Sequence, residues 1–107
     1  MNKILSAIYS HAQSTPEKIA LTGTTTTGAT IQLTYAELVA QVNLLANWLS
    51  AQNIDRIGLW GENSSEWIIA DLAAWQANIT LVPLPRFFSN AQLEHVIAQA
   101  QLSCILV

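Results

Sequence analysis

The sequence has 107 residues, which is the size of one domain with a single hydrophobic core. Only 10% of its residues are charged, against about 25% in average globular proteins, so too few charges are available to cover an ordinary surface. We therefore expect part of the apolar surface to meet a partner or further sequence. The net charge is −3 and the basic residues lie far apart, which argues against nucleic acid and anionic membrane surfaces as partners. These basic residues are Lys3, Lys18, Arg56 and Arg86.

Neither a membrane span nor a secretory signal is predicted. A span needs about 18 consecutive apolar residues, and the apolar segment Trp67–Ala77 is interrupted by Asp71. Lys3 precedes only a short apolar patch broken by Ser6, and no small-residue cleavage pattern follows. The single cysteine, Cys104, excludes an intrachain disulfide and fits a reducing compartment, so we expect a cytoplasmic protein.

The chain begins with a predicted helix and hairpin. Residues Asn2–Gln13 carry apolar side chains at helical spacing, and Pro16 follows the end of this helix. Segments Ile19–Thr22 and Ala29–Leu33 are typical of two strands joined by a turn. Glycines bracket the threonine run between them, which favours a loop tip over longer strands. The apolar positions of the helix are Ile4, Leu5, Ile8 and Ala12.

A second helix is predicted to begin at a capping box. In Thr34 to Glu37, the Thr hydroxyl can accept from the backbone at Glu37 while the Glu carboxylate reaches back to the cap N–H. An apolar stripe follows, and the helix should end near Gln52 and Asn53, since Asn tolerates a left-handed exit. The stripe consists of Leu38, Val42, Leu45 and Leu49.

Strands and helices alternate from Arg56 onward. A strand over Arg56–Trp60, a cap-rich turn over Gly61–Ser65 and a helix from Ser65 to Ala77 are predicted, with Asn78 as the exit residue. The alanines of this helix leave little polar surface, so we expect it to be covered on most sides. Its main inward stripe is predicted to be Trp67, Ile68, Leu72 and Trp75.

The last third predicts two further strands around one helix. Ile79–Leu84 is continuously apolar, as in strands buried on both faces of a parallel sheet. Ser89 and Gln92 repeat the capping-box spacing before a helix, and Cys104–Val107 is typical of a buried strand. The inward stripe of that helix is predicted to be Leu93, Val96, Ile97 and Ala100.

This order predicts an α/β fold in which a β-α-β-α-β unit forms a parallel sheet with right-handed crossovers. We expect one incomplete domain over residues 1–107, with the helix, hairpin and helix in 1–53 and the parallel unit in 54–107. Because a parallel sheet wants helices on both faces and neighbours at its edges, a chain that stops on an apolar strand at Val107 is interpreted as truncated.

No residue pattern predicts a catalytic, cofactor-binding or metal site. Segment Gly58–Ser65 joins a strand end to a helix start, where anions bind in α/β sheets, but it lacks G-x-G-x-x-G and the P-loop lysine. Glu62 would also repel a phosphate, so helix capping is favoured. His11 and His95 have no ligand partners at zinc spacing, and Cys104 has no flanking base, which favours an inert core thiol.

Aromatic residues offer the one candidate contact. The four tryptophans are scattered along the predicted elements, where core or interdomain packing explains them better than a stacking platform. Phe87 and Phe88 differ, because two adjacent aromatics in a loop cannot easily both face one core. We predict that one of them contacts either a neighbouring subdomain or an apolar substrate.

Four segments in this order and at these separations resemble the opening of adenylate-forming enzymes, the acyl-CoA synthetases and their relatives. They are Thr15–Leu21, Leu33–Leu38, Asp55–Leu59 and Leu81–Leu84. The resemblance covers nearly the whole chain. It departs from the family at Asn78, where Gly is frequent, and at Pro85, where a polar residue commonly follows, and this second departure leaves the acyl substrate open.

The resemblance implies a parent ligase that uses ATP, magnesium and coenzyme A. Such an enzyme converts a small carboxylic acid into an acyl-adenylate and then passes the acyl group to a thiol. The family's phosphate loop, ribose-binding Asp, magnesium-associated Glu and catalytic Lys come later in such chains, so none maps onto this sequence. We expect the chain to act as a scaffold that contacts the remainder of the parent and to be inactive alone.

Two alternatives remain open from the sequence. An amino-acid-adenylating domain of a peptide synthetase shares the same opening segments. The chain could instead be a stand-alone α/β protein-interaction module. In either case the exposed apolar surface or an edge strand offers a route to dimers.

Overall fold

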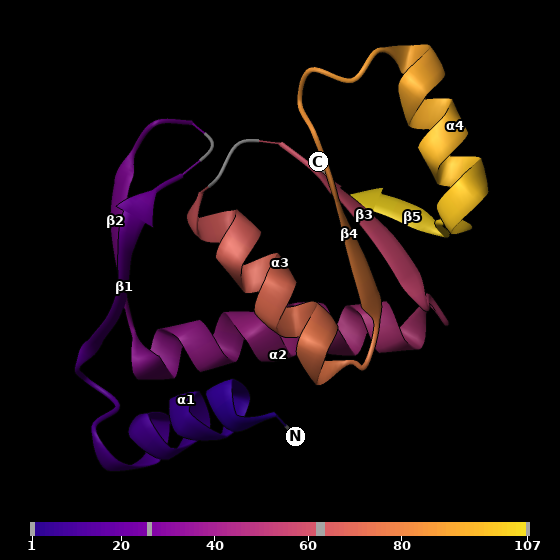
Figure 1. Ribbon diagram of the computed structural model, residues 1–107. Coiled ribbons are helices and arrows are strands. Elements are labelled where there is room, and N and C mark those ends of the chain that lie inside the picture. Colours follow the sequence, from indigo (N-terminus) through magenta and orange to yellow (C-terminus); the bar gives the residue numbers. More distant parts are fainter. Residues whose placement is uncertain (1, 26, 62–63, 107) are drawn as a thin grey trace.

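The computed structural model describes residues 2–25, 27–61 and 64–106, and its first half is a helix, a hairpin and a second helix (Figure 1). Helix α1 spans Lys3–Ser14, and its cap Asn2 accepts a hydrogen bond from the Leu5 amide at 2.8 Å. Strands β1 (Ile19–Thr24) and β2 (Thr30–Thr34) pair antiparallel. The predicted elements are confirmed.

The hairpin turn is tighter than its two glycines suggest. Gly28 has φ +89°, as a turn requires, but Gly23 lies inside β1 opposite Ile31. Thr24 likewise pairs with Thr30, so the threonine run extends β1 before it turns, and its member Thr26 lies outside the described residues. The predicted loop tip is therefore shorter than expected, because β-branched threonines also favour strands.

Helix α2 spans Tyr35–Ala51 and begins at the predicted capping box. The Glu37 amide donates to Thr34 Oγ1 at 3.1 Å, and the Thr34 amide donates to Glu37 Oε1 at 2.9 Å. Asn53, with φ 54°, supplies the predicted left-handed exit. The buried side of α2 consists of Leu38, Val42, Ala46 and Leu49, and Leu45 is half-buried.

The second half is a parallel sheet with two crossover helices. Strands β3 (Arg56–Trp60), β4 (Thr80–Leu84) and β5 (Cys104–Leu106) lie in the order β4-β3-β5 over the described residues. Helices α3 (Ser65–Gln76) and α4 (Asn90–Ala100) connect them. The chain moves outward from β3 to β4 and then back past β3 to β5, so right-handed crossovers place α3 and α4 on opposite sides of the sheet (Figure 1).

Helix α3 turns a different face inward than its large side chains predict. Ile68 and Trp75 of the predicted stripe are each 42% exposed. The buried side is instead rich in alanine, whose small side chains let α3 pack closely against α2 and the strands. It consists of Ile69, Ala70, Leu72, Ala73 and Ala74, in addition to Ser65.

Burial within the sheet is concentrated in β3. Ile57, Gly58 and Leu59 are buried, whereas Thr80 and Pro83 of β4 are exposed. The expectation that β4 is buried on both faces is therefore wrong for this chain, because β4 lies at an edge of the sheet, where a proline is tolerated.

The last helix and strand are also less buried than their sequences predict. No residue of α4 is fully buried, and its predicted stripe is half-buried. The described residues of β5 are half-buried as well, and Val107 lies outside the described residues. Cys104 packs against the main core while keeping some exposure. The predicted core position of its thiol is thus only partly confirmed.

Candidate functional site

Ligands of open α/β sheets bind beyond the carboxyl ends of the parallel strands. There, the last residue of β3 is joined to the turn after β4, because Trp60 Nε1 donates to the Pro85 carbonyl at 3.2 Å. The Phe88 amide also donates to that carbonyl at 3.2 Å. This carbonyl therefore fixes the turn that carries the predicted aromatic pair.

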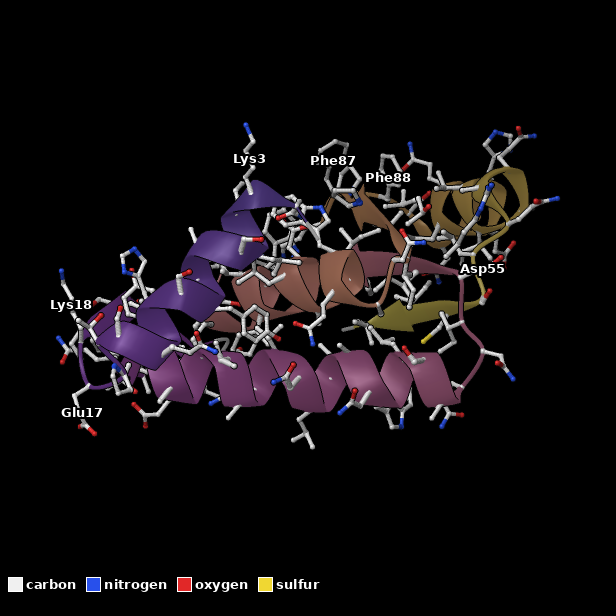
Figure 2. The ribbon with its side chains drawn as sticks, turned by 90° about the horizontal axis from the view of Figure 1, so that it is seen from below. Lys3, Glu17, Lys18, Asp55, Phe87 and Phe88 are labelled. Atoms are coloured by element: carbon white, nitrogen blue, oxygen red, sulfur yellow. The ribbon has the colours of Figure 1, made fainter. Side chains whose placement is uncertain are left out.

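Phe87 and Phe88 lie in different environments, as the sequence predicted for two adjacent aromatics. Phe88 is half-buried, whereas Phe87 is 82% exposed (Figure 2). Their rings meet edge to face, with centroids 5.5 Å apart and planes at 81°. The turn thus presents one aromatic ring to solvent in a defined orientation. What Phe87 contacts stays a prediction.

The start of α3 is capped from within the chain. Ser64 is the N-cap, and its Oγ accepts from the Trp67 amide at 3.3 Å. The next residue, Ser65, is buried and donates to Glu66 Oε1 at 3.0 Å. The capping interpretation of this segment is confirmed at Ser64, while Glu62 and Asn63 lie outside the described residues.

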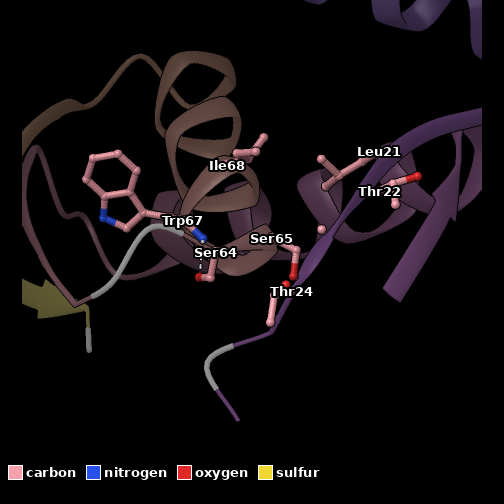
Figure 3. A pocket seen from close by; sticks show the side chains of 8 residues that line it. Leu21, Thr22, Thr24, Ser64, Ser65, Trp67 and Ile68 are labelled. Carbon is pink, nitrogen blue, oxygen red and sulfur yellow. Dashed lines mark hydrogen bonds between the residues drawn. The ribbon is translucent and has the colours of Figure 1, made fainter. Parts of the chain in front are cut away.

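An open pocket of about 450 Å³ lies between the hairpin and the start of α3 (Figure 3). Leu21 of β1 and Ile68 of α3 lie on opposite sides of it. Two serines, two threonines, Gly23 and Trp67 line the rest, and none of the described lining residues is charged. A pocket of this kind suits an apolar group and offers no cation for a phosphate.

The basic residues do not converge on either place, although one of them, Arg86, lies in the turn next to Phe87. Lys3 and Lys18 lie well apart (Figure 2), and Arg56 Nη1 donates to the Ala100 carbonyl at 3.0 Å, at the end of α4. His11 packs its ring against Tyr35, with centroids 5.0 Å apart. Over the described ranges, no three His, Cys, Asp or Glu side chains gather closely enough to hold a metal ion.

The tryptophans divide into two kinds. Trp48 and Trp75 are 46% and 42% exposed, so core packing does not account for them. Trp60 and Trp67 are half-buried, and the buried indole nitrogen of Trp67 has no hydrogen-bond partner in the described part of the chain. The bond from Trp60 to Pro85 was not predicted, because no local pattern links a strand residue to a carbonyl 25 residues away.

The described elements form an α/β fold with an antiparallel hairpin and a parallel sheet in the order β4-β3-β5. The sequence profile of the AMP-binding enzyme family matches residues 8–107, and the chain belongs to this family. The resemblance seen in the sequence is thereby confirmed.

Relatives of two kinds match the chain. The mitochondrial medium-chain acyl-CoA ligase ACSF2 of Macaca fascicularis is 36% identical over 89 residues, which is 80% of this chain and 14% of that enzyme. A linear gramicidin synthase of Brevibacillus parabrevis is 37% identical over 98 residues, which is 89% of this chain and 2% of that protein. The chain therefore spans only a small part of the relatives that it matches.

Solved structures give the same result. The crystal structure of apo MatB from Rhodopseudomonas palustris superimposes on 98% of this chain with a TM-score of 0.75 and 30% identity, and the match covers 21% of that chain. The α/β architecture with its parallel sheet is therefore that of adenylate-forming enzymes. None of the helices in the described segments has the length and apolarity that a membrane crossing requires.

Proposed function

We propose that this chain is the N-terminal scaffold portion of an ATP-dependent acyl- or aryl-CoA ligase, in the large domain of that enzyme. The parent activates a small carboxylic acid as an acyl-adenylate and transfers the acyl group to coenzyme A. The observation that carries the proposal is the family match over residues 8–107. The 36% identity to a protein named as a medium-chain acyl-CoA ligase supports coenzyme A as the acceptor.

In this proposal the chain supplies no site of its own for ATP, magnesium or coenzyme A. Adenylation must stabilise a developing pyrophosphate with cations and oriented backbone donors. The pocket beside α3 has no charged lining residue, Arg56 is engaged with the end of α4, and the start of α3 is capped by Ser64. In this proposal the nucleotide and the metal are held by other parts of the parent, and the chain alone is inactive.

The turn that carries Phe87 is where this chain is proposed to reach a substrate or a neighbouring subdomain. Phe87 is exposed, and its backbone is fixed through the Pro85 carbonyl. If Phe87 contacts an apolar acid, Phe87→Ala raises the KM of the parent for that acid and leaves the KM for ATP unchanged. A subdomain contact instead lowers kcat for all acids alike.

An amino-acid-adenylating domain of a peptide synthetase is the second candidate, and the 37% identity to the linear gramicidin synthase favours it. The two candidate functions differ in the acid that is activated and in the thiol that accepts the acyl group. A CoA ligase releases AMP in proportion to added coenzyme A with fatty or aryl acids. An adenylating domain activates an amino acid and gives no CoA-dependent AMP release.

We place the parent in the cytoplasm, and the single cysteine of this chain supports a reducing compartment. The ACSF2 relatives are named as mitochondrial proteins, so an organelle is the alternative. Fractionation of cells that express the tagged parent, with a cytoplasmic and an organelle marker, tests this point. Recovery of the parent with the organelle marker would contradict a cytoplasmic location.

A further inference from the structure

One face of α2 is both apolar and exposed. Gln41, Leu44, Leu45 and Trp48 follow one another at steps of three, one and three residues, which places them along one side of the helix. Together with Ile69 of α3 they line an open groove of about 460 Å³. Leu44 is 75% exposed and Trp48 is 46% exposed.

The chemistry of this α2–α3 groove is that of a covered surface. Gln41 is the one polar residue among the described residues that line it, and none of them is charged. Helix α2 as a whole has one charged residue, Glu37, among its 17 residues. Helices that face water carry charged and polar side chains on their outer side. Leucine and tryptophan at the centre of an uncharged groove are typical of an interface.

The shape of the groove favours a helix as its occupant. Side chains at these spacings form a ridge along α2, and a ridge beside a second helix leaves a groove into which the ridge of another helix packs. The parallel sheet has its edges at β4 and β5 and the hairpin has its edges at β1 and β2, whereas the described lining of the groove comes from α2 and α3. An added strand has no free backbone partner on α2, because the amides and carbonyls inside a helix already bond to each other.

We propose that the α2–α3 groove is an intramolecular interface, covered by an apolar face of a helix from the remaining part of the parent ligase. The inference rests on the proposed function, in which this chain belongs to a longer enzyme. The chain spans 14% of the acyl-CoA ligase that it matches and 21% of the MatB chain, so most of such a protein is available to cover it. Low overall charge, at 10% of residues, fits a segment that is enclosed in its parent.

Cysteine labelling in the full-length parent tests this interface. Leu44→Cys places a thiol in the groove, and Ser50→Cys places one on another, exposed side of the same helix. Maleimide modification of each peptide is followed by mass spectrometry, which separates these sites from other cysteines. We expect Leu44→Cys to react at least about tenfold more slowly than Ser50→Cys, because labelling then requires local opening of the interface.

Trp48→Cys provides a second thiol in the groove in case Leu44→Cys perturbs the parent, and acid-dependent ATP–pyrophosphate exchange shows that each variant is folded. Rates within about twofold of the Ser50→Cys rate at both groove positions would overturn the interface. Protection that disappears on dilution would overturn it in favour of a second copy. A parent without adenylating activity counts against the proposed function, whereas an active parent with a freely reactive groove counts against this inference alone.

Discussion

The hydroxyl oxygen of Tyr9 on α1 lies 2.6 Å from Oδ1 of Asn43 on α2. The side-chain amide of Gln76, at the end of α3, contacts both of these groups. Three helices are therefore joined by one half-buried polar cluster. Together with the apolar packing of α2 against α3, the cluster holds the first half of the chain against the second.

Removing the hydroxyl tests the strength of this cluster. We expect Tyr9→Phe to lower the free energy of unfolding by about 1–3 kcal/mol, because Gln76 Oε1 loses its donor and Asn43 Oδ1 keeps only the bond from the Gln76 amide. Urea denaturation of the wild type, Tyr9→Phe, Asn43→Ala and the double variant measures the coupling. Losses that simply add in the double variant would show that Tyr9 and Asn43 do not interact.

The two capping boxes give a matched pair for a pH experiment. Thr34→Ala and Ser89→Ala should each lower stability by about 1 kcal/mol at neutral pH, since each removes the acceptor for an amide of the first helical turn. The box at α2 uses a carboxylate, Glu37, whereas the box at α4 uses the uncharged Gln92. The contribution from the α2 box should therefore depend on pH, and that from the α4 box should not.

The sign of this dependence follows from Glu37. The Thr34 backbone N–H, followed by the Thr34 side chain, lowers the pKa of Glu37 from its ordinary value of 4.5. A carboxylate whose folded pKa is lowered stabilises the fold above its unfolded pKa, and the contribution is lost as pH falls through the folded pKa. The stability difference between the wild type and Glu37→Gln should thus shrink below about pH 4.5. A constant difference from pH 7 to pH 3 would contradict the box.

A side chain at Gly58 is predicted to displace two leucine side chains. A Cβ at this central strand position would lie 2.8 Å from Leu84 Cδ1 and 2.9 Å from Leu102 Cδ1. Gly58→Ala should therefore cost about 1–3 kcal/mol through overpacking. Gly23→Ala is the control, because its Cβ would lie 4.0 Å from the nearest side-chain atom, on Ser65. Equal thermal midpoints for the two variants would contradict this view of the sheet.

Gln101 ends α4 in the left-handed conformation, with φ 55°. Residues other than Gly and Asn are strained in this conformation. Gln101→Gly should therefore raise the free energy of unfolding by up to about 1 kcal/mol. Asn78 ends α3 with φ 60°, and Asn78→Gly should change stability less, because Asn tolerates this region. Denaturant midpoints compare the two, and a larger gain at Asn78 would refute the argument.

Local chemistry explains what the sequence predicts well. The capping boxes at Thr34 and Ser89 involve residues three positions apart, and the left-handed exits at Asn53 and Asn78 depend on a single residue type. All of these were predicted, because the interactions are complete within one turn of the chain. The bounds of β3 were predicted for a similar reason, since Arg56 and Gly61 limit a short apolar run.

Long-range packing explains what the sequence does not predict. The inward face of α3 depends on how closely alanines allow α2 to approach, so the large Trp75 and Ile68 were wrongly placed inside. Whether β4 is central or at an edge depends on strand order, which hydrophobicity alone does not encode. The contacts of Tyr9 with Asn43 and of Trp60 with Pro85 span 34 and 25 residues and have no sequence signature.

Acid-dependent exchange of labelled pyrophosphate into ATP tests the central claim most directly, with the full-length parent and the purified 107-residue chain assayed side by side. The account predicts exchange by the parent with a fatty or aryl acid and none by the chain alone, because the described residues provide no cluster of cations for a pyrophosphate. Exchange catalysed by the chain alone would contradict its role as a scaffold, and a parent that is inactive with every acid would contradict the proposed ligase.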